Sequence, residues 1–426
     1  MFMHKSKKGF TIVELVIVIA VIAILAAVLI PTFSNLVKKA NIANDTALAK
    51  NINTALTAYK ATNAGDMEFE DVIAAARDAG YIISNLNPTT AGHYFVWEKS
   101  TNQILLVDGE NAYKVIYANN EKYAPIGENW YFATSDKTAA AALKADAALA
   151  SANIKDMIAN VADLSAAIAD GGEVYLDESV VLDKDNLIIL DQDKEITLNL
   201  GTSSVNTSGI VEDVIPVQIT SGNVTIKGGI IGGGGSYVDE DGKIVSSPIL
   251  TDEGATTVLD GTAINVTANN GYPLFAGETT TKNVVINSQN IGAYVAGNAV
   301  VTLENTSITS NGRVVWSCNL IYTNEATKET GHAGTAHAIF KSGTYHGGNN
   351  TWAPIVSCGG KITIEGGTFT SNTEDIFQFN GSGEITVKGG TFAGKTLSQL
   401  GKTGLQALCA NGTVTENADG SFTIKK

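Results

Sequence analysis

One uninterrupted apolar run near the start of the chain constrains its structure more than any other feature. Between residues 10 and 30 the only polar residues are Thr11 and Glu14, and residues 15–30 contain none. A backbone surrounded by lipid must satisfy its own hydrogen bonds, as a helix does. Because each helical residue adds about 1.5 Å, about 20 residues cross the hydrocarbon core of a bilayer. The run therefore predicts a membrane-spanning helix.

The residues before this run form a short basic leader that contains Lys5, Lys7 and Lys8. A secretory signal peptide places its small-residue cleavage site after the apolar run, whereas here the small Gly9 precedes it. Cleavage after Gly9 would leave the helix attached to the mature protein. The predicted leader is residues 1–9.

The local sequence is Lys7-Lys8-Gly9-Phe10-Thr11-Ile12-Val13-Glu14-Leu15-Val16. It resembles the processing site of type IV prepilins and of the pseudopilins of type II secretion. The resemblance implies cleavage after Gly9 and methylation of the new amino group of Phe10, both by a prepilin peptidase/N-methyltransferase. It also implies a cytoplasmic leader, a head outside the cytoplasmic membrane, and assembly with other pilin or pseudopilin subunits.

Glu14 is the one carboxylate inside the predicted span. An ionised carboxylate in a hydrocarbon environment costs at least about 2.5 kcal/mol, which marks it as a functional residue. The resemblance implies that its partner is the amino group of Phe10 in a neighbouring subunit. Pro31 removes one helical hydrogen bond, and we expect it to kink the helix or to end the buried stretch.

Apolar residues continue at three- and four-residue steps beyond Pro31, which predicts one pilin-type helix over residues 10–62. Residues 63–135 predict a small α+β head, in which a helix from Phe69 to Ala79 precedes an antiparallel meander. The predicted strands of the meander are Tyr94–Glu98, Gln103–Val107 and Ala112–Tyr117. Residues 136–170 are alanine-rich with helical spacing, and they predict a helical connector and a cap.

Residues 171–426 repeat one short phrase of alternating β-branched residues followed by glycine or asparagine. Its copies begin at Ile196, Val224, Thr257, Val284, Val301, Ala338, Ile362 and Ile385. The steps between these starts cluster near the length of one solenoid coil. The two longest steps, which lead to Thr257 and to Ala338, indicate loop insertions at Gly232 to Ser247 and at Asn311 to Thr335. We expect the first, third and eighth places of each copy to point inward.

This repeat resembles the right-handed parallel β-helices of pectate-lyase-like and bacterial surface proteins. The predicted fold is therefore a membrane-anchored α+β protein with a pilin-type helix, a small head and a parallel β-helix. A β-sandwich of short strands is the alternative for residues 171–426.

Catalytic and binding residues are harder to find in the sequence. The acids at Asp183, Asp185, Asp191 and Asp193, and in the turn Asp239-Glu240-Asp241-Gly242, show no paired spacing that glycoside hydrolysis or calcium binding would need. The histidines His332, His337 and His346 and the cysteines Cys318, Cys358 and Cys409 lack metal-ligand spacing. Two of the cysteines could pair outside the cell. Trp97, Trp130, Tyr94 and Tyr117 are candidates for a sugar-stacking surface, although such strand aromatics are usually core.

The charge balance limits the choice of partner. The formal net charge is −15, and loss of the three leader lysines makes it −15 − 3 = −18. This acidity argues against a nucleic-acid partner, and the two arginines, Arg77 and Arg313, offer few contacts to acidic ligands.

Taken together, these sequence features predict no cofactor, no metal and no enzymatic activity. It predicts a minor or tip subunit of a pilus or pseudopilus at the cell surface, because a bulky domain on every subunit would crowd a fibre.

Two other functions stay open from the sequence. In the first, the chain is a membrane-anchored adhesin or carbohydrate-binding protein, with a surface glycan as its ligand. In the second, it is a polysaccharide-degrading enzyme, as many β-helix proteins are. Retention of a glycan by residues 171–426, with and without turnover, distinguishes the two.

Overall fold

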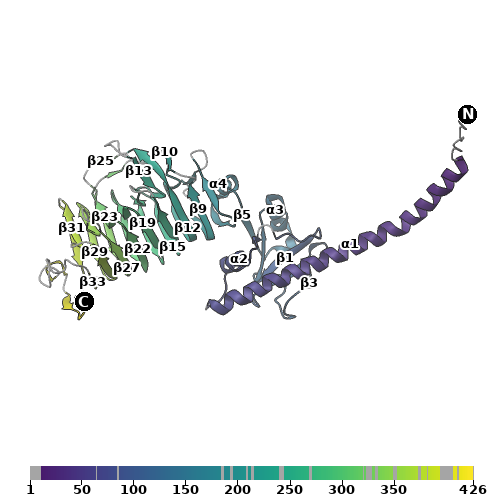
Figure 1. Cartoon of the computed structure of the whole chain (residues 1–426), viewed down its shortest axis with the longest axis horizontal. Coiled ribbons are helices and arrows are strands. Elements are labelled where there is room, and N and C mark those ends of the chain that lie inside the picture. Colours follow the sequence, from purple (N-terminus) through teal and green to yellow (C-terminus); the bar gives the residue numbers. More distant parts are fainter. Residues whose placement is uncertain are drawn as a thin grey trace, which may run out of the picture.

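The computed structural model describes residues 11–425 except 64, 84–85, 184–186, 192–194, 208–209, 213–214, 239–243, 268–270, 320, 323–328, 332–333, 349–352, 373–375, 381, 394–405 and 410–411. A long helix, a small head and a tall stack of strands follow one another along the molecule (Figure 1).

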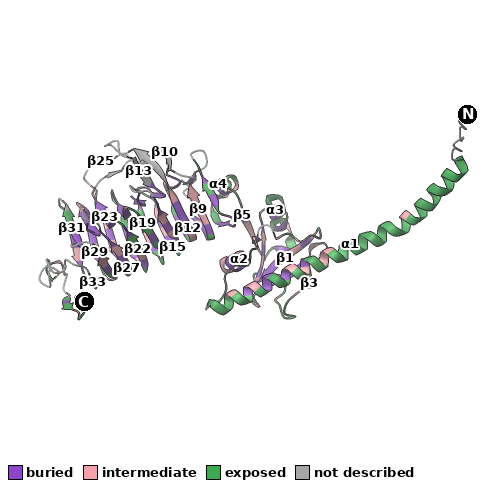
Figure 2. Cartoon of the chain, in the orientation of Figure 1, coloured by how far each residue is buried: buried purple, intermediate pink, exposed green. Residues whose placement is uncertain are grey.

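The first element is α1 (Ile12–Thr62), a single gently curved helix of 51 residues (Figure 1). It continues through Pro31, which therefore lies inside the helix. Proline removes one backbone donor, and the hydrogen bonds of the neighbouring turns remain to hold the helix. The first half of α1 is exposed, whereas the second half lies against the head (Figure 2).

The head places a four-stranded sheet against α1 and α2 (Phe69–Asp78). Its strands are β1 (His93–Glu98), β2 (Gln103–Asp108), β3 (Lys114–Tyr117) and β4 (Trp130–Thr134), with the short 3-10 helix η2 (Gly109–Asn111) between β2 and β3. The pairs β1–β2, β2–β3 and β1–β4 are antiparallel, so the three predicted strands do form a meander and β4 extends it.

The alanine-rich segment, for which the spacing predicts a helical connector and a cap, is only partly helical. It contains α3 (Lys137–Ala145), η3 (Ala147–Leu149), β5 (Asn153–Ile158) and α4 (Val161–Asp170). Helical spacing through Ile154 and Ile158 is misleading here, because these residues belong to a strand. β5 gains backbone partners on both sides, since it pairs in parallel with β4 and with β6 (Gly172–Leu176), and tertiary pairing overrides the local helix preference of alanine.

Residues 172–393 form three stacks of parallel strands, which we call the column. The first stack contains β6, the start of β9 (Glu195–Thr207), the start of β12 (Asn223–Val238), β15 (Thr256–Asp260), β18 (Glu278–Lys282), β21 (Val300–Glu304), β26 (His337–Phe340), β29 (Lys361–Ile364) and β32 (Glu384–Val387). The second contains β7 (Val180–Leu182), the later parts of β9 and β12, β16 (Ala263–Val266), β19 (Val285–Ser288), β22 (Thr306–Ser310), β27 (Gly343–Gly347), β30 (Thr368–Ser371) and β33 (Gly390–Ala393). The third contains β8 (Ile188–Leu190), β11 (Val217–Ile219), β14 (Ile249–Thr251), β17 (Leu274–Phe275), β20 (Ile291–Val295), β23 (Arg313–Cys318), β28 (Ile355–Cys358) and β31 (Phe377–Asn380).

Each strand of the column pairs with its counterpart one coil further along, as in Val224 with Thr257 and Thr344 with Thr368. Parallel pairing of this kind differs from the antiparallel pairing of the alternative β-sandwich. Among the described strands of the column and its ends, antiparallel pairs occur only in β12–β13 (Ile244–Ser247), β24 (Ile321–Tyr322)–β25 (Glu329–Gly331), β33–β35 (Phe422–Lys425) and β34 (Thr413–Glu416)–β35. The strands β13, β24 and β25 lie in the two predicted insertions, and β10 (Ile210–Glu212) pairs beside the first of them. The predicted start of the second insertion at Asn311 is wrong, because β23 continues the third stack as far as Cys318.

The column buries the predicted inward places. The first, third and eighth places of the copy at Val301 are Val301, Leu303 and Ile308, and all three are buried. The predicted copy at Val284 is wrong. The strand found there, β19, belongs to the second stack, and the first-stack strand of that coil is β18. With Thr279 as the start of this coil, the step from Thr257 and the step to Val301 are equal.

The apolar pattern of the sequence does not reveal β18, because the two inward residues of this strand are threonines. Thr279 and Thr281 are buried, and their hydroxyls hydrogen-bond Thr251 and Thr306 of neighbouring strands at 3.3 and 2.7 Å. A buried hydroxyl is tolerated when it has such a partner. The pattern of apolar residues alone therefore cannot locate this coil.

Both ends of the column are covered in the described part of the chain. α4 lies over the first coil, with Leu164 and Ile168 buried in the same core as Val174 and Leu176 of β6. At the other end, β35 pairs antiparallel with β33, and Phe422 and Ile424 complete the core. Covered ends keep the strand edges from pairing with other chains.

Candidate functional site

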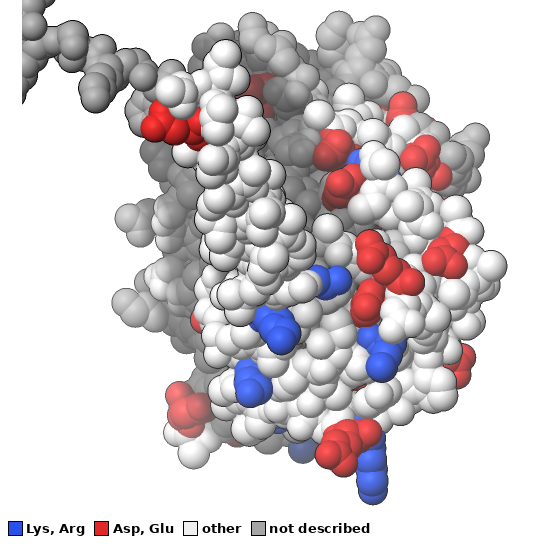
Figure 3. Space-filling model, turned by 90° about the vertical axis from the view of Figure 1, so that its right-hand side faces the viewer, with Lys and Arg blue, Asp and Glu red and all other residues white. Residues whose placement is uncertain are grey.

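The exposed half of α1 is the first candidate site. Its exposed large apolar residues include Ile12, Leu15, Ile19, Ile22, Leu25, Leu29, Phe33 and Val37. α1 is long and apolar enough to cross a membrane by length and composition, and its most apolar stretch is wholly unburied, with a mean hydropathy of 3.3. Figure 3 shows the helix as an almost uncharged rod with basic side chains near its base. Lys38 and Lys39, which follow the apolar half of α1, are exposed.

Glu14 lies in the first turn of α1, where it forms a reciprocal cap with Thr11. The backbone N–H and the hydroxyl of Thr11 donate to Glu14 Oε2 at 2.9 and 2.8 Å, and the Glu14 N–H donates to Thr11 Oγ1 at 3.3 Å. A carboxylate at this position satisfies helix amides that lack an internal partner. In the single chain the Glu14 carboxylate is therefore held by its own helix. The predicted processing residues Gly9 and Phe10 lie outside the described residues.

The second half of α1 is fixed to the head by buried polar contacts as well as by apolar ones. Asn53 is buried, and its side-chain amide pairs with the backbone of Ile104 in β2. The amide oxygen accepts from the N–H of Ile104 at 2.7 Å, and the amide nitrogen donates to its C=O at 2.9 Å. Asp45, also buried, accepts from the backbone N–H groups of Thr89 and Thr90 at 2.7 and 3.2 Å. These contacts fix the axial position of the helix on the head.

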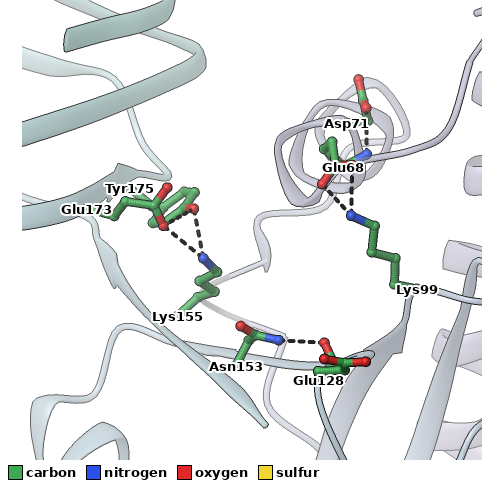
Figure 4. Close-up of polar contacts among 8 residues, drawn as sticks. All are labelled: Glu68, Asp71, Lys99, Glu128, Asn153, Lys155, Glu173 and Tyr175. Carbon is green, nitrogen blue, oxygen red and sulfur yellow. Dashed lines mark hydrogen bonds and ion pairs between the residues drawn. The ribbon is translucent and has the colours of Figure 1, made fainter. Parts of the chain in front are cut away.

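The junction between head and column is a second candidate site. Lys155 of β5 donates to the Glu173 carboxylate at 3.1 Å and to the Tyr175 hydroxyl at 2.8 Å, and this hydroxyl also donates to Glu173 at 2.8 Å (Figure 4). The Lys155 ammonium also lies 4.5 Å from the centroid of the Tyr175 ring. Tyr175 in turn packs edge-on against Phe69 of α2. Residues of the head, β5 and the column therefore meet in one polar and aromatic cluster.

The ionisation of this cluster follows from its contacts. Burial opposes ionisation of Glu173, but hydrogen bonds from Tyr175 and Lys155 outweigh it and hold the pKa of Glu173 below its usual value. Burial and the bond to Glu173 raise the pKa of Tyr175. Glu173 is thus anionic and Tyr175 neutral at neutral pH, so the ammonium of Lys155 faces one full negative charge. The arrangement joins β5 to the first strand of the column.

A second bridge crosses the same junction. Arg77 of α2 donates to the C=O of Asp177 and to the hydroxyl of Thr202, both in the column, and its guanidinium lies 3.8 Å from the Asp177 carboxylate. In the sequence Arg77 is notable only as one of two arginines, and no motif marks Lys155. The partner of Arg77 at position 177 is 100 residues away along the chain, so no local pattern could reveal the contact.

The other candidate residues are dispersed. Among the described residues no three His, Cys, Asp or Glu side chains gather as metal ligands. The imidazoles of His337 and His346 each hydrogen-bond a threonine one coil further along, Thr363 and Thr370, at 2.8 and 2.7 Å. His332, Asp185, Asp193, Asp239, Glu240 and Asp241 lie outside the described residues. Asp183 directly follows β7, and Asp191 directly follows β8.

The candidate sugar-stacking aromatics do not form an exposed platform. Trp97 and Trp130 are buried in the head, where Trp97 packs against Phe69 and Tyr131. Tyr94 packs edge-on against Phe132, and Tyr117 is only half-buried on β3. The two tryptophans therefore belong to the core, and the described part of the head offers no paired indole face for a sugar ring.

These features define a class of protein: a membrane-anchored subunit with an apolar helix that projects from a small α+β head. Comparison with known proteins then identifies the family. The model of the prokaryotic N-terminal methylation motif matches residues 4–30. Over 134 residues the chain is 32% identical to the type IV wide pilus major component PilA4 of Thermus thermophilus, a match that covers 86% of that protein and 31% of this chain. The chain belongs to the type IV pilin family.

Other relatives match over a shorter segment of 57 residues. The chain is 40% identical over 57 residues to the type IV major pilin protein PilE of Neisseria gonorrhoeae and to a fimbrial protein of Neisseria meningitidis serogroup B. These matches span 34% of each relative, about a third of its length, and 13% of this chain. No solved structure matches the chain.

Proposed function

We propose that this chain is a non-enzymatic type IV pilin-like subunit, located at the tip of a fibre or present in it as a minor component. Prepilin peptidase cleaves it after Gly9 and methylates Phe10, and the subunit then assembles with other pilins through α1. The exposed apolar half of α1 carries this proposal, because its large side chains are covered only by lipid or by the helices of neighbouring subunits.

The column supports a terminal or minor position. Residues 171–426 make up more than half of the chain, so they outweigh the helix and the head together. A helical lattice repeats every subunit at a fixed rise, so an added domain of this size on each subunit must be accommodated at every step. A subunit at the tip or at low abundance avoids that crowding.

We also propose that the column is a right-handed parallel β-helix. Three stacks of parallel strands support this fold, as do coils of nearly constant length where insertions are absent, such as Thr257 to Thr279 and Ile362 to Ile385. Parallel β connections in one sheet are almost always right-handed. A cryo-EM map of the fibre-associated or detergent-solubilised subunit tests it, and a left-handed path would contradict it.

Mass spectrometry tests the processing step directly. The mature protein should begin at a methylated Phe10, because cleavage after Gly9 removes the basic leader and leaves the apolar helix. A Gly9→Ala variant should be cut more slowly, and a bulkier residue at position 9 should prevent cleavage. An intact leader on the surface-exposed protein would contradict the proposal.

Quantification of sheared fibres tests the position in the fibre. Fibres should contain this subunit at well below one copy per major subunit, and labelling with an antibody against the column should mark fibre ends or sparse sites. Uniform labelling along every fibre would show a major subunit instead. Retention of a glycan by the column would favour the adhesin alternative.

A further inference from the structure

Two of the three cysteines lie at matched positions in successive coils of the column. Cys318 ends β23 and Cys358 ends β28, and the two residues are direct partners in the parallel register of these strands. Neighbouring strands are about 4.8 Å apart, and paired residues present their side chains on the same face. This spacing falls within the Cα–Cα range of about 4.4–6.8 Å that disulfides span.

The backbone brings the two positions together from more than one direction. The N–H of Asn319 donates to the C=O of Cys358 at 3.1 Å, and Cys318 also forms an isolated bridge with Gly359. Gly359 has φ +79°, and a Cβ at this position would lie 2.5 Å from Cγ of Asn319. The glycine thus allows the chain after Cys358 to turn closely against the segment that follows Cys318.

The surroundings of the two thiols favour a covalent link. Cys318 is buried and Cys358 packs at the edge of the same apolar cluster, beside Tyr294 and Trp316. The guanidinium carbon of Arg313 lies 4.2 Å from the centroid of the Trp316 ring. Its charge interacts with both cysteines, which places a cation beside any thiolate that forms there. Cys409 lies elsewhere, in an isolated bridge with Val387 near the last coil.

We propose that Cys318 and Cys358 form a disulfide that joins two successive coils once the column lies outside the cytoplasmic membrane. The external location rests on the proposed function, whereas the pairing rests on the register. One S–S bond forms as the two thiols give up two protons and two electrons. The acceptor is the disulfide of a thiol oxidoreductase or of a small thiol, which becomes two thiols. The bond closes the loop that carries the insertion between β23 and β28.

Peptide mapping of the full-length protein, extracted from cell membranes in detergent with free thiols alkylated, tests this proposal. Cys318 and Cys358 should appear in one linked peptide pair, whereas Cys409 should carry the alkyl group. Reduction should lower the melting temperature by roughly 5–10 °C, because the loop is released in the unfolded chain. The variant Cys318→Ala with Cys358→Ala should show no such shift, and Cys409→Ala should show the full shift.

Oxidation of the purified, reduced protein with glutathione disulfide separates geometry from location. A linked pair in this reaction supports the register argument whether or not the leader has been cleaved. If Cys318 and Cys358 are alkylated in this reaction as readily as Cys409, the pairing is wrong. If they pair in vitro but remain thiols on the cell surface, the disulfide is not part of the displayed protein. Neither result changes the N-terminal processing, which is measured on a separate peptide.

Discussion

At the scale of single residues, Glu14 has an observed partner within its own chain and a proposed partner in the fibre. In the isolated chain its carboxylate accepts from the N–H and the hydroxyl of Thr11, so the first turn is capped without a neighbour. In a fibre, the proposed partner is the charged amino group of Phe10 in an adjacent subunit. A charge pair in a medium of low dielectric constant strongly favours one register over another, because a broken pair leaves an uncompensated charge.

We predict that Glu14→Leu leaves membrane insertion intact but prevents assembly. Leucine is favoured over glutamate in hydrocarbon by at least about 2.5 kcal/mol, so the helix should still insert and lose its leader. The amount of this protein in sheared fibres should fall at least about tenfold, which corresponds to a loss of about 1.4 kcal/mol or more. Glu14→Gln should behave similarly, and the matched control Val13→Leu should assemble normally. Wild-type amounts of both Glu14 variants in fibres would show that Glu14 does not set the register.

How far single residues can be identified from the sequence depends on the distance to their partners. Gly9, Phe10 and Glu14 stand within six positions of one another, so a local motif in the sequence is enough to predict them. Asn53 bonds a residue 51 positions away, and Arg77 bonds one 100 positions away. Nothing near either residue in sequence indicates these contacts, which only the fold creates.

At the scale of secondary-structure elements, the charged residues of the column alternate from coil to coil. Along one edge of the first stack, successive coils carry Lys227, Asp260, Lys282, Glu304, Lys341, Glu365 and Lys388. The Nζ of Lys341 lies 2.6 Å from Oε1 of Glu304, and the Nζ of Lys388 lies 3.1 Å from Oε1 of Glu365. A slip by one coil would place like charges side by side, so this row disfavours the wrong register.

We predict that Glu304→Lys destabilises the column by about 1 kcal/mol, because it would lie between Lys282 and Lys341. The loss should shrink in salt of about 1 M, where exposed charges are screened. Glu278→Lys makes the same change of charge in the neighbouring strand β18, but its register partner there is Thr256. This control should change the free energy of unfolding by less than about 0.5 kcal/mol. Chemical denaturation of the three proteins at two salt concentrations measures the difference, and equal losses in both variants would contradict an ionic row.

The repeat itself is readable from the sequence wherever aliphatic residues occupy its inward places, as at Val301 and Leu303. The repeat cannot be recognised at β18, where buried threonines that hydrogen-bond other threonines occupy the inward places. The strand β5 is also not recognisable from the sequence, because its alanine-rich surroundings favour a helix whereas its two neighbouring strands impose an extended backbone. In both cases a partner from another coil or sheet outweighs the local preference.

At the scale of the whole molecule, head and column share one sheet, and the core of the head reaches the first strand of the column. β5 pairs with β4 of the head and with β6 of the column, so the backbone ladder is continuous across the junction. The core of the head extends from Ile52 and Leu56 of α1 to Met157 of β5 and Tyr175 of β6. Load applied to the column would therefore reach α1 through a packed unit rather than through a flexible linker.

This continuity predicts that residues 38–426, which lack the exposed apolar half of α1, unfold in a single transition. A fold of two independent units would show two transitions, but here melting of either part exposes the core and the strand edge of the other. Circular dichroism and calorimetry on the same sample should give coincident midpoints. Ile154→Pro interrupts β5, where proline cannot donate to a ladder, and it should separate the transition into two, the lower from the head. Ile116→Val, a conservative change at an exposed position on β3, is the matched control and should leave one transition within about 1 °C of the parent. Two transitions in the unaltered protein would show that the column is joined to the head only loosely, and the packed unit inferred from β5 would be wrong.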